Sequence, residues 1–84
     1  MNVEEPRQEL QKLAELRHKL LEAYDLSQEV GPARPKRAPG ERYDPQTPPE
    51  QRPTPLDVLI AHTIAESENQ IWAIERLLER RGSE

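Results

Sequence analysis

Residues 31–53 read GPARPKRAPGERYDPQTPPEQRP, and this proline-rich stretch decides how the rest of the chain is organised. Eight of the nine prolines lie between Pro32 and Pro55. Proline lacks a backbone N–H and clashes with the preceding helical turn, so the stretch is predicted to contain neither a helix nor a central strand. The chain therefore divides into a helix within residues 1–30, an extended connector over residues 31–53 and a second helix within residues 54–84.

The segment before the connector has the pattern of an amphipathic helix from about residue 5 to residue 30. Pro6 suits the first helical turn, and Gly31 followed by Pro32 is a strong stop signal. Leucines, alanines and one tyrosine recur with helical spacing and form one broad apolar stripe. The core seam predicted within this stripe comprises Leu13, Leu20 and Tyr24.

The segment after the connector predicts a second helix with a clearly marked start. Thr54 is a good N-cap, Pro55 fits the first helical position, and Asp57 completes an approximate capping box. Ser67 interrupts a heptad pattern of apolar residues. It either sets the register of the seam or bonds to a carbonyl one turn earlier, and the second interpretation is favoured. The apolar members of this seam are Ile60, Ile64, Ile71, Ile74 and Leu78.

A second stripe follows the same helix on another side and combines small residues with the only tryptophan. Small residues permit a close approach between helices, and tryptophan is a frequent anchor of protein interfaces. Alanine is also the best helix former, so exposed alanines alone would have a simpler explanation. We favour a contact face. Its predicted members, called here the Trp72 stripe, are Val58, Ala61, Ala65, Asn69, Trp72 and Arg76.

The composition predicts a small protein that completes its core with a protein partner. The 84 residues are 33% hydrophobic and 33% charged, and cysteine is absent, which excludes disulfides and thiolate metal sites. No apolar run approaches the roughly 20 residues that span a bilayer, and the N-terminus lacks the pattern of a signal peptide. We therefore expect no membrane association, and a location in the cytoplasm or within an assembled particle.

The charge is distributed unevenly. Residues 1–30 and residues 54–84 each carry a net charge of −3, whereas residues 31–53 carry +2. This is not the pattern of a general nucleic-acid binder. The connector can act as a solvated tether, as a partner-binding segment with polyproline character, or as a contact for nucleic acid, in that order of preference. Its candidate contacts to a peptide or a phosphate are Arg34, Lys36, Arg37 and Arg42.

Chemical sites are not expected. Glu15 and His18 have the spacing of ligands in di-iron bundles, but the helical pattern places them away from the apolar stripe. His62 and Glu66 form an i,i+4 pair without a third ligand at a recognisable spacing. No nucleophile motif and no phosphate-binding loop is present. We therefore expect no catalytic residue, no metal and no cofactor.

Together these patterns predict an all-α protein in which two long amphipathic helices form a hairpin. The hairpin would complete a bundle by self-association, as a homodimer or higher oligomer, or by docking on a larger complex. The expected function is that of a non-enzymatic interaction or assembly subunit, and a phage component is one setting that fits. The alternatives are a small regulator, such as an antitoxin or transcription modulator with a basic connector on nucleic acid, and a small metal-binding or catalytic bundle.

Overall fold

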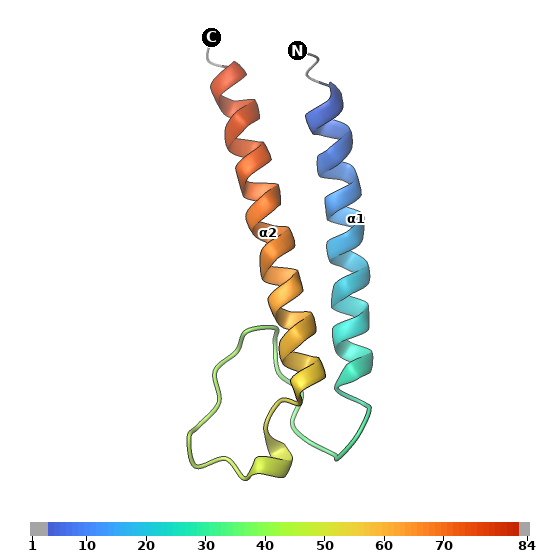
Figure 1. The fold of residues 1–84 in the computed structure, drawn as a ribbon, viewed down its shortest axis with the longest axis vertical. Helices are drawn as coiled ribbons and strands as arrows, with labels where there is room; N and C mark the ends of the chain where they lie inside the picture. The colour runs from blue at the N-terminus through green and yellow to red at the C-terminus, as the bar shows by residue number, and fades with distance from the viewer. Residues whose placement is uncertain (1–3, 83–84) are drawn as a thin grey trace.

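The computed structural model describes residues 4–82 and consists of two long helices packed side by side. α1 spans Glu4–Ser27, α2 spans Pro55–Gly82, and one turn of 3-10 helix, η1, spans Pro49–Gln51. The long helices run antiparallel in a rod of 53 × 22 × 15 Å (Figure 1). The prediction of an all-α helical hairpin is confirmed, and no strand occurs among the described residues. Residues 1–3 and 83–84, which belong to the predicted helical segments, lie outside this description.

α1 ends at Ser27, earlier than the sequence pattern predicted. The chain leaves the helix through a turn in which the Gln28 N–H donates to the Tyr24 carbonyl and the Val30 N–H donates to the Ser27 carbonyl. Gly31 then adopts a φ of 87°, a left-handed conformation that carries no steric penalty for glycine. The helix stops early because turn hydrogen bonds replace its last predicted turn before the glycine redirects the chain.

The start of α2 is the capping box that the sequence predicted. The Asp57 N–H donates to Thr54 Oγ1 at 3.2 Å, and the Thr54 N–H donates back to the Asp57 carboxylate at 3.0 Å. Pro55 occupies the first helical position, where its missing N–H leaves no hydrogen bond unmade. The Val58 N–H donates to the Thr54 carbonyl at 3.0 Å and so forms the first helical hydrogen bond.

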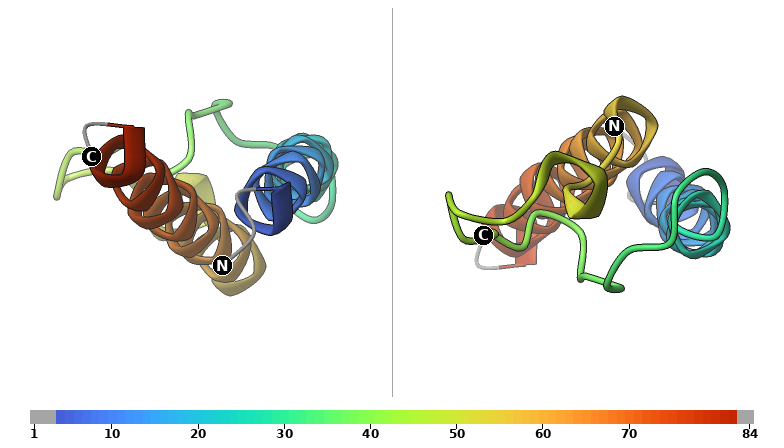
Figure 2. Two further views of the ribbon diagram at one scale, coloured as in Figure 1. Left: turned by 90° about the horizontal axis from the view of Figure 1, so that it is seen from above. Right: turned by 90° about the horizontal axis from the view of Figure 1, so that it is seen from below.

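The connector forms a loop at the closed end of the hairpin and beside the first turns of α2 (Figures 1 and 2). It does not run along the whole hairpin as an extended chain. The prediction that it contains no helix is wrong for the single turn η1, which tolerates Pro49 because a first-turn residue needs no N–H partner. Gly40, with a φ of 78°, reverses the chain a second time.

The core between the helices is thin. Apart from Pro6, the apolar residues that are buried within residues 5–80 are Tyr24 and Ile64. Ser67 is also buried, and its hydroxyl donates to the Ile64 carbonyl at 2.7 Å, in agreement with the favoured interpretation of this residue. No helix in the described part of the chain is long and apolar enough to cross a membrane. The other predicted seam residues are all half-buried: Leu13, Leu20, Ile60, Ile71, Ile74 and Leu78.

Candidate interaction surface

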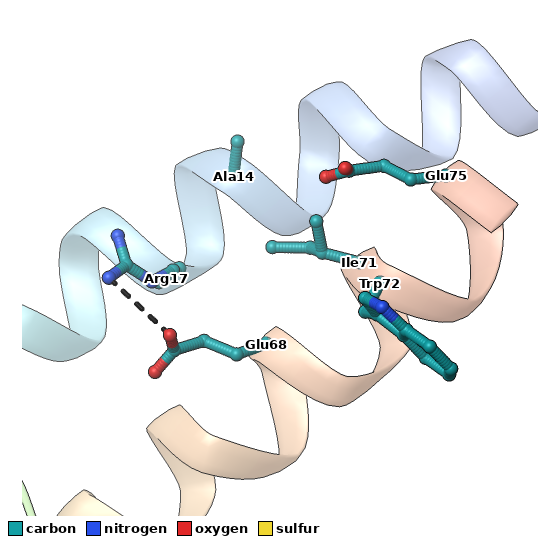
Figure 3. A pocket seen from close by; sticks show the side chains of 6 residues that line it. All are labelled: Ala14, Arg17, Glu68, Ile71, Trp72 and Glu75. Atoms are coloured by element: carbon teal, nitrogen blue, oxygen red, sulfur yellow. Dashed lines mark ion pairs between the residues drawn. The ribbon is translucent and has the colours of Figure 1, made fainter.

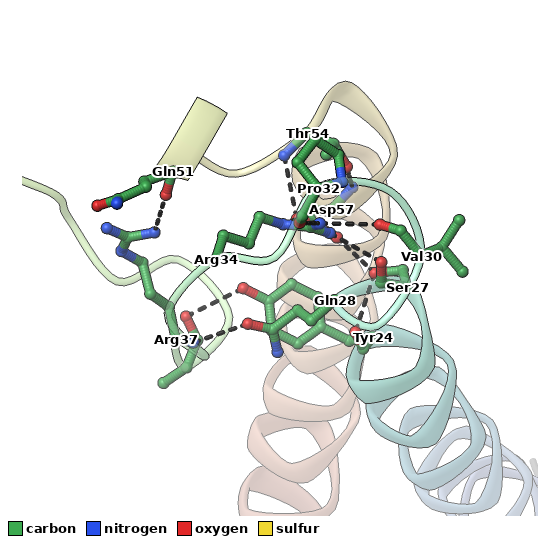
Figure 4. Close-up of polar contacts among 11 residues, drawn as sticks. Tyr24, Ser27, Gln28, Val30, Pro32, Arg34, Arg37, Gln51, Thr54 and Asp57 are labelled. Carbon is green, nitrogen blue, oxygen red and sulfur yellow. Dashed lines mark hydrogen bonds and ion pairs between the residues drawn. The ribbon is translucent and has the colours of Figure 1, made fainter. Parts of the chain in front are cut away.

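Asp57 lies at the centre of a buried polar clamp that joins the end of α1, the connector and the start of α2 (Figure 4). Its side chain is 2% exposed. The Ser27 hydroxyl lies 2.6 Å from Asp57 Oδ1 and 2.9 Å from the Tyr24 carbonyl. Its single proton goes to the carboxylate, because the charged acceptor is nearer and forms the stronger hydrogen bond. The other carboxylate oxygen accepts the Thr54 N–H of the capping box.

Arg34 closes this clamp from the connector. Its side chain is 1% exposed, and Nε and Nη2 donate to Asp57 Oδ2 at 3.0 and 2.8 Å. Nη1 donates to the carbonyls of Val30 and Pro32, and Nη2 also donates to the Ser27 carbonyl at 2.8 Å. All five N–H donors of the guanidinium therefore have an acceptor. The Ser27 carbonyl lies at the C-terminus of α1 and already accepts the Val30 N–H, so Arg34 adds a second donor at this helix end.

The electrostatics of the clamp keep Asp57 ionised. Burial by itself raises the pKa of Asp57, but hydrogen bonds from the Ser27 hydroxyl and the Thr54 backbone, together with the charge of Arg34, outweigh burial. The pKa therefore lies below the ordinary value of 3.8. No buried side-chain nitrogen or oxygen among the described residues lacks a hydrogen-bond partner. The network joins the end of α1, the connector and the start of α2, and fixing the register of packed elements is the best-attested use of a buried ion pair.

Tyr43 holds together the second part of the connector. The guanidinium carbons of Arg37 and Arg52 lie 5.6 and 5.7 Å from the centre of its ring, within cation–π distance. Arg37 Nη1 donates to the Gln51 carbonyl at 2.9 Å, and Arg52 donates to two further connector carbonyls at 2.9 and 3.1 Å. The loop is thus fixed by its own arginines and is not a free tether.

The four connector cations predicted to contact a peptide or a phosphate occupy different environments. Arg34 is buried in the clamp, which corrects its assignment as an external contact. Lys36 Nζ lies 3.6 Å from Glu29 Oε1 on the surface. Arg37 belongs to the Tyr43 cluster, and Arg42 is exposed. The structure therefore uses two of these four arginine and lysine residues to hold the connector in place.

The first half of the Trp72 stripe borders the connector. Val58, Ala61 and Ala65 line a groove of about 320 Å³ whose other wall includes Gly40 and Tyr43. Val58 and Ala65 are exposed, and Ala61 is half-buried. The connector therefore divides the predicted stripe, because only the part beyond Ala65 is clear of it.

The second half of the stripe is open to solvent. Trp72 is 61% exposed, and the guanidinium carbon of Arg76 lies 5.1 Å from its ring centre. Figure 3 shows the indole directed away from α1, beside a hollow of about 330 Å³ between the helices. Arg17 and Glu68, 3.7 Å apart, form an ion pair across this hollow. An exposed indole with an adjacent guanidinium combines two residue types that dominate the energetics of protein interfaces. Asn69 lies exposed one turn before this pair.

The carboxylate and histidine pairs considered as metal ligands are exposed helical pairs. His18 Nε2 lies 3.0 Å from Glu22 Oε1, and His62 Nε2 lies 3.7 Å from Glu66 Oε1. Glu15 instead forms the expected i,i+4 pair with Lys19, at 3.8 Å. Within residues 4–82, no group of three or more His, Cys, Asp or Glu side chains is placed to hold a metal ion.

The clamp is the main feature that the sequence did not reveal. The capping box identified Asp57 as a partner of Thr54, and one carboxylate oxygen then remained without an assigned partner. Nothing in the spacing distinguished Arg34 from the other cations of the connector as that partner. The position of Arg34 shortly after the Gly31 stop was the available signal, since a cation there can reach the carbonyls at a helix end.

Comparison with known proteins supplies no relative. The chain matches no protein-family model, no curated protein and no solved structure. Its function therefore has to be inferred from the side chains that the clamped hairpin exposes.

Proposed function

We propose that this chain is a non-enzymatic protein–protein interaction or assembly subunit that uses α2 as its contact element. The observation that carries the proposal is the exposed pair of Trp72 and Arg76 on the open half of the stripe. Covering the exposed part of this indole would contribute about 3 kcal/mol, at about 25 cal/mol per Å² over an area of somewhat more than 100 Å². A partner that covers the ring thus gains a large part of the binding free energy from one residue.

The clamp supports this proposal because it prepares α2 for binding. Asp57 and Arg34 hold the start of α2 against the end of α1 and the connector. A contact element that is already fixed in place loses less conformational entropy when a partner binds. The connector acts in this proposal as a wrap around the start of α2, because its own arginines hold it in a loop.

Protein contact is better supported than nucleic-acid contact. Arg34 is fully occupied inside the clamp, and Arg37 is engaged with Tyr43. Few cations of the connector are therefore left to neutralise phosphates, whose contacts dominate nucleic-acid affinity. Residence in the cytoplasm or in an assembled particle, such as a phage, is part of the same proposal.

The experiment is an affinity capture that compares three forms of the chain. The wild type, Trp72→Ala and Leu59→Ala are immobilised and exposed to extract from the source organism. Leu59 is a matched control because it lies on the same helix with the same exposed fraction as Trp72, 61%. We expect a protein that binds the wild type and Leu59→Ala and is lost with Trp72→Ala.

A titration with the purified partner then tests the contact directly. Trp72 is the only tryptophan of the chain, so its fluorescence reports this position alone when the partner lacks tryptophan or carries an analogue. The proposal requires emission at shorter wavelength and protection from iodide quenching when the partner binds. A partner that binds Trp72→Ala as tightly as the wild type would contradict the proposal.

A further inference from the structure

The hairpin has a second apolar surface on the side opposite the Trp72 stripe. On α2, Leu56 and Ile74 are each nine residues from Ala65, which is two and a half helical turns. They therefore lie on the side of the helix opposite Ala65. On α1, Leu16 follows Ala14 by two residues, about 200° around the helix, and Ala14 lines the hollow beside Trp72. Both helices thus contribute to this surface.

This surface, called here the rear face, has exposed leucines on both helices. The same spacing places Glu5 and Lys12 of α1 toward its edge at the open end of the hairpin. Leu16 and Leu56 are 48% and 49% exposed. The connector does not cover the rear face, because it walls the groove beside Ala61 and Ala65 on the other side of α2. Half-buried seam residues border the same face: Leu13, Leu20, Ile60 and Ile74.

The accessible area indicates how much surface remains to be covered. A compact monomer of 9.7 kDa is expected to expose about 5,100 Å². The hairpin exposes 6565 Å², which is about 1,400 Å² more. A standard protein interface buries about 800 Å² on each partner. The excess is larger than the area that one partner buries in a standard interface, so burial of one face in a dimer would bring the exposed area of each chain closer to that of a compact protein.

We infer that the rear face is the contact between two copies of this chain, which pair into a four-helix bundle. A hairpin whose core contains so few buried apolar residues requires a partner whenever it is folded. A second copy meets this requirement, because it is present wherever the chain is made. A two-fold dimer also closes on itself and buries the same face of both copies.

The two hydroxyl residues that α2 contributes to the rear face are compatible with burial. The Thr63 hydroxyl already donates to the Leu59 carbonyl at 2.9 Å, so covering it leaves no donor unpaired. Ser67 likewise donates to the Ile64 carbonyl. This inference does not rest on the proposed function, because it uses the opposite side of the hairpin and is tested without any other protein.

The test is the mass in solution, measured by light scattering over a hundredfold range of concentration. We expect the wild type to have twice the mass of the chain. The double variant Leu16→Glu with Leu56→Glu should raise the dissociation constant of the dimer at least about a hundredfold, because a dimer would bury four additional carboxylates at an apolar contact. Circular dichroism at the highest concentration checks that the variant remains helical.

The matched control is Val58→Glu. Val58 is two residues from Leu56, similarly exposed and on the Trp72 stripe, so the dimer should tolerate a carboxylate there. A wild-type chain that is monomeric throughout, or that forms only larger oligomers, overturns the inference. Dimerisation of the double variant as tight as that of the wild type overturns it as well, and so does loss of the dimer in Val58→Glu. If the double variant is unfolded, Leu16→Ser takes its place. This substitution should weaken the dimer to a smaller extent, and unchanged dimerisation of Leu16→Ser would then overturn the inference.

Discussion

Replacing Arg34 with methionine removes the guanidinium from the clamp while it keeps an unbranched apolar stem. Asp57 then loses its ion pair but keeps the hydrogen bonds from Ser27 and Thr54. The Ser27 carbonyl keeps the N–H of Val30 as a donor, and the Val30 and Pro32 carbonyls lie in exposed residues where water can replace Nη1. Removing one partner of a buried ion pair costs about 3–5 kcal/mol. We expect a loss of stability near the lower value, because water can hydrate the two carbonyls that Nη1 no longer reaches.

Such a loss is large for a chain of this size, whose total stability is about 4–13 kcal/mol. The assay is urea denaturation followed by circular dichroism, at one fixed protein concentration because self-association shifts the apparent stability. A double-mutant cycle with Asp57→Asn separates the ion pair from the other contacts. Asparagine keeps an oxygen for the capping box but removes the charge that Arg34 balances. We expect the double variant to be more stable than the sum of the single losses predicts, by about 1–3 kcal/mol.

Two results would contradict a stabilising ion pair between Arg34 and Asp57. A loss of less than about 1 kcal/mol in Arg34→Met would place the ion pair in the class of surface salt bridges, which contribute little. Additive losses in the cycle would show that Arg34 and Asp57 do not stabilise each other.

The other predictions concern pH, the helix ends and the tryptophan. The pKa of Asp57 is lowered in the folded chain, so its contribution to stability is present above the unfolded pKa near 4 and is lost as pH falls through the folded pKa. Urea titrations between pH 7 and pH 2 should show this loss in the wild type, and a parallel profile in Asp57→Asn would contradict it. Thr54→Ala removes the N-cap of α2 and should lower the free energy of unfolding by about 1 kcal/mol; an unchanged urea midpoint would show that the cap is dispensable. Gly31→Ala places a side chain at a φ of 87° and should lower the free energy of unfolding by about 1 kcal/mol or more, which thermal unfolding can measure. Trp72→Ala should change the stability of the isolated chain by less than about 1 kcal/mol, because most of the ring is already in solvent; a larger loss by urea denaturation would assign Trp72 to the core.

Local signals explain what could be predicted of the fold. Thr54, Pro55 and Asp57 mark the start of α2, and each acts through contacts with neighbouring residues in the chain. The proline spacing of the connector similarly excludes any long helix there. The end of α1 was predicted less well, because Ser27 and Arg34 replace the expected last turn by contacts that depend on the hairpin.

The long-range contacts of the candidate site lie beyond such local signals. Arg34 and Asp57 are brought together by the path of the connector, and the sequence does not state that path. The Trp72 stripe was predicted from helical spacing as one continuous face. Its division arises because Gly40 and Tyr43 lie across from its first half, and only the folded loop places them there. Spacing predicts which residues share a side of a helix, while the connector determines what lies opposite them.

Site-specific photo-crosslinking in cells of the source organism tests the use of α2 as a contact element most directly. A photoreactive amino acid is introduced at position 72, and at position 70 in a control. Gln70 is also exposed but lies about 200° away around the helix, on the other side from the stripe. We expect a crosslink from position 72 to a different protein, and much less of that product from position 70. No crosslink to another protein from position 72, or equal products from both positions, would contradict it.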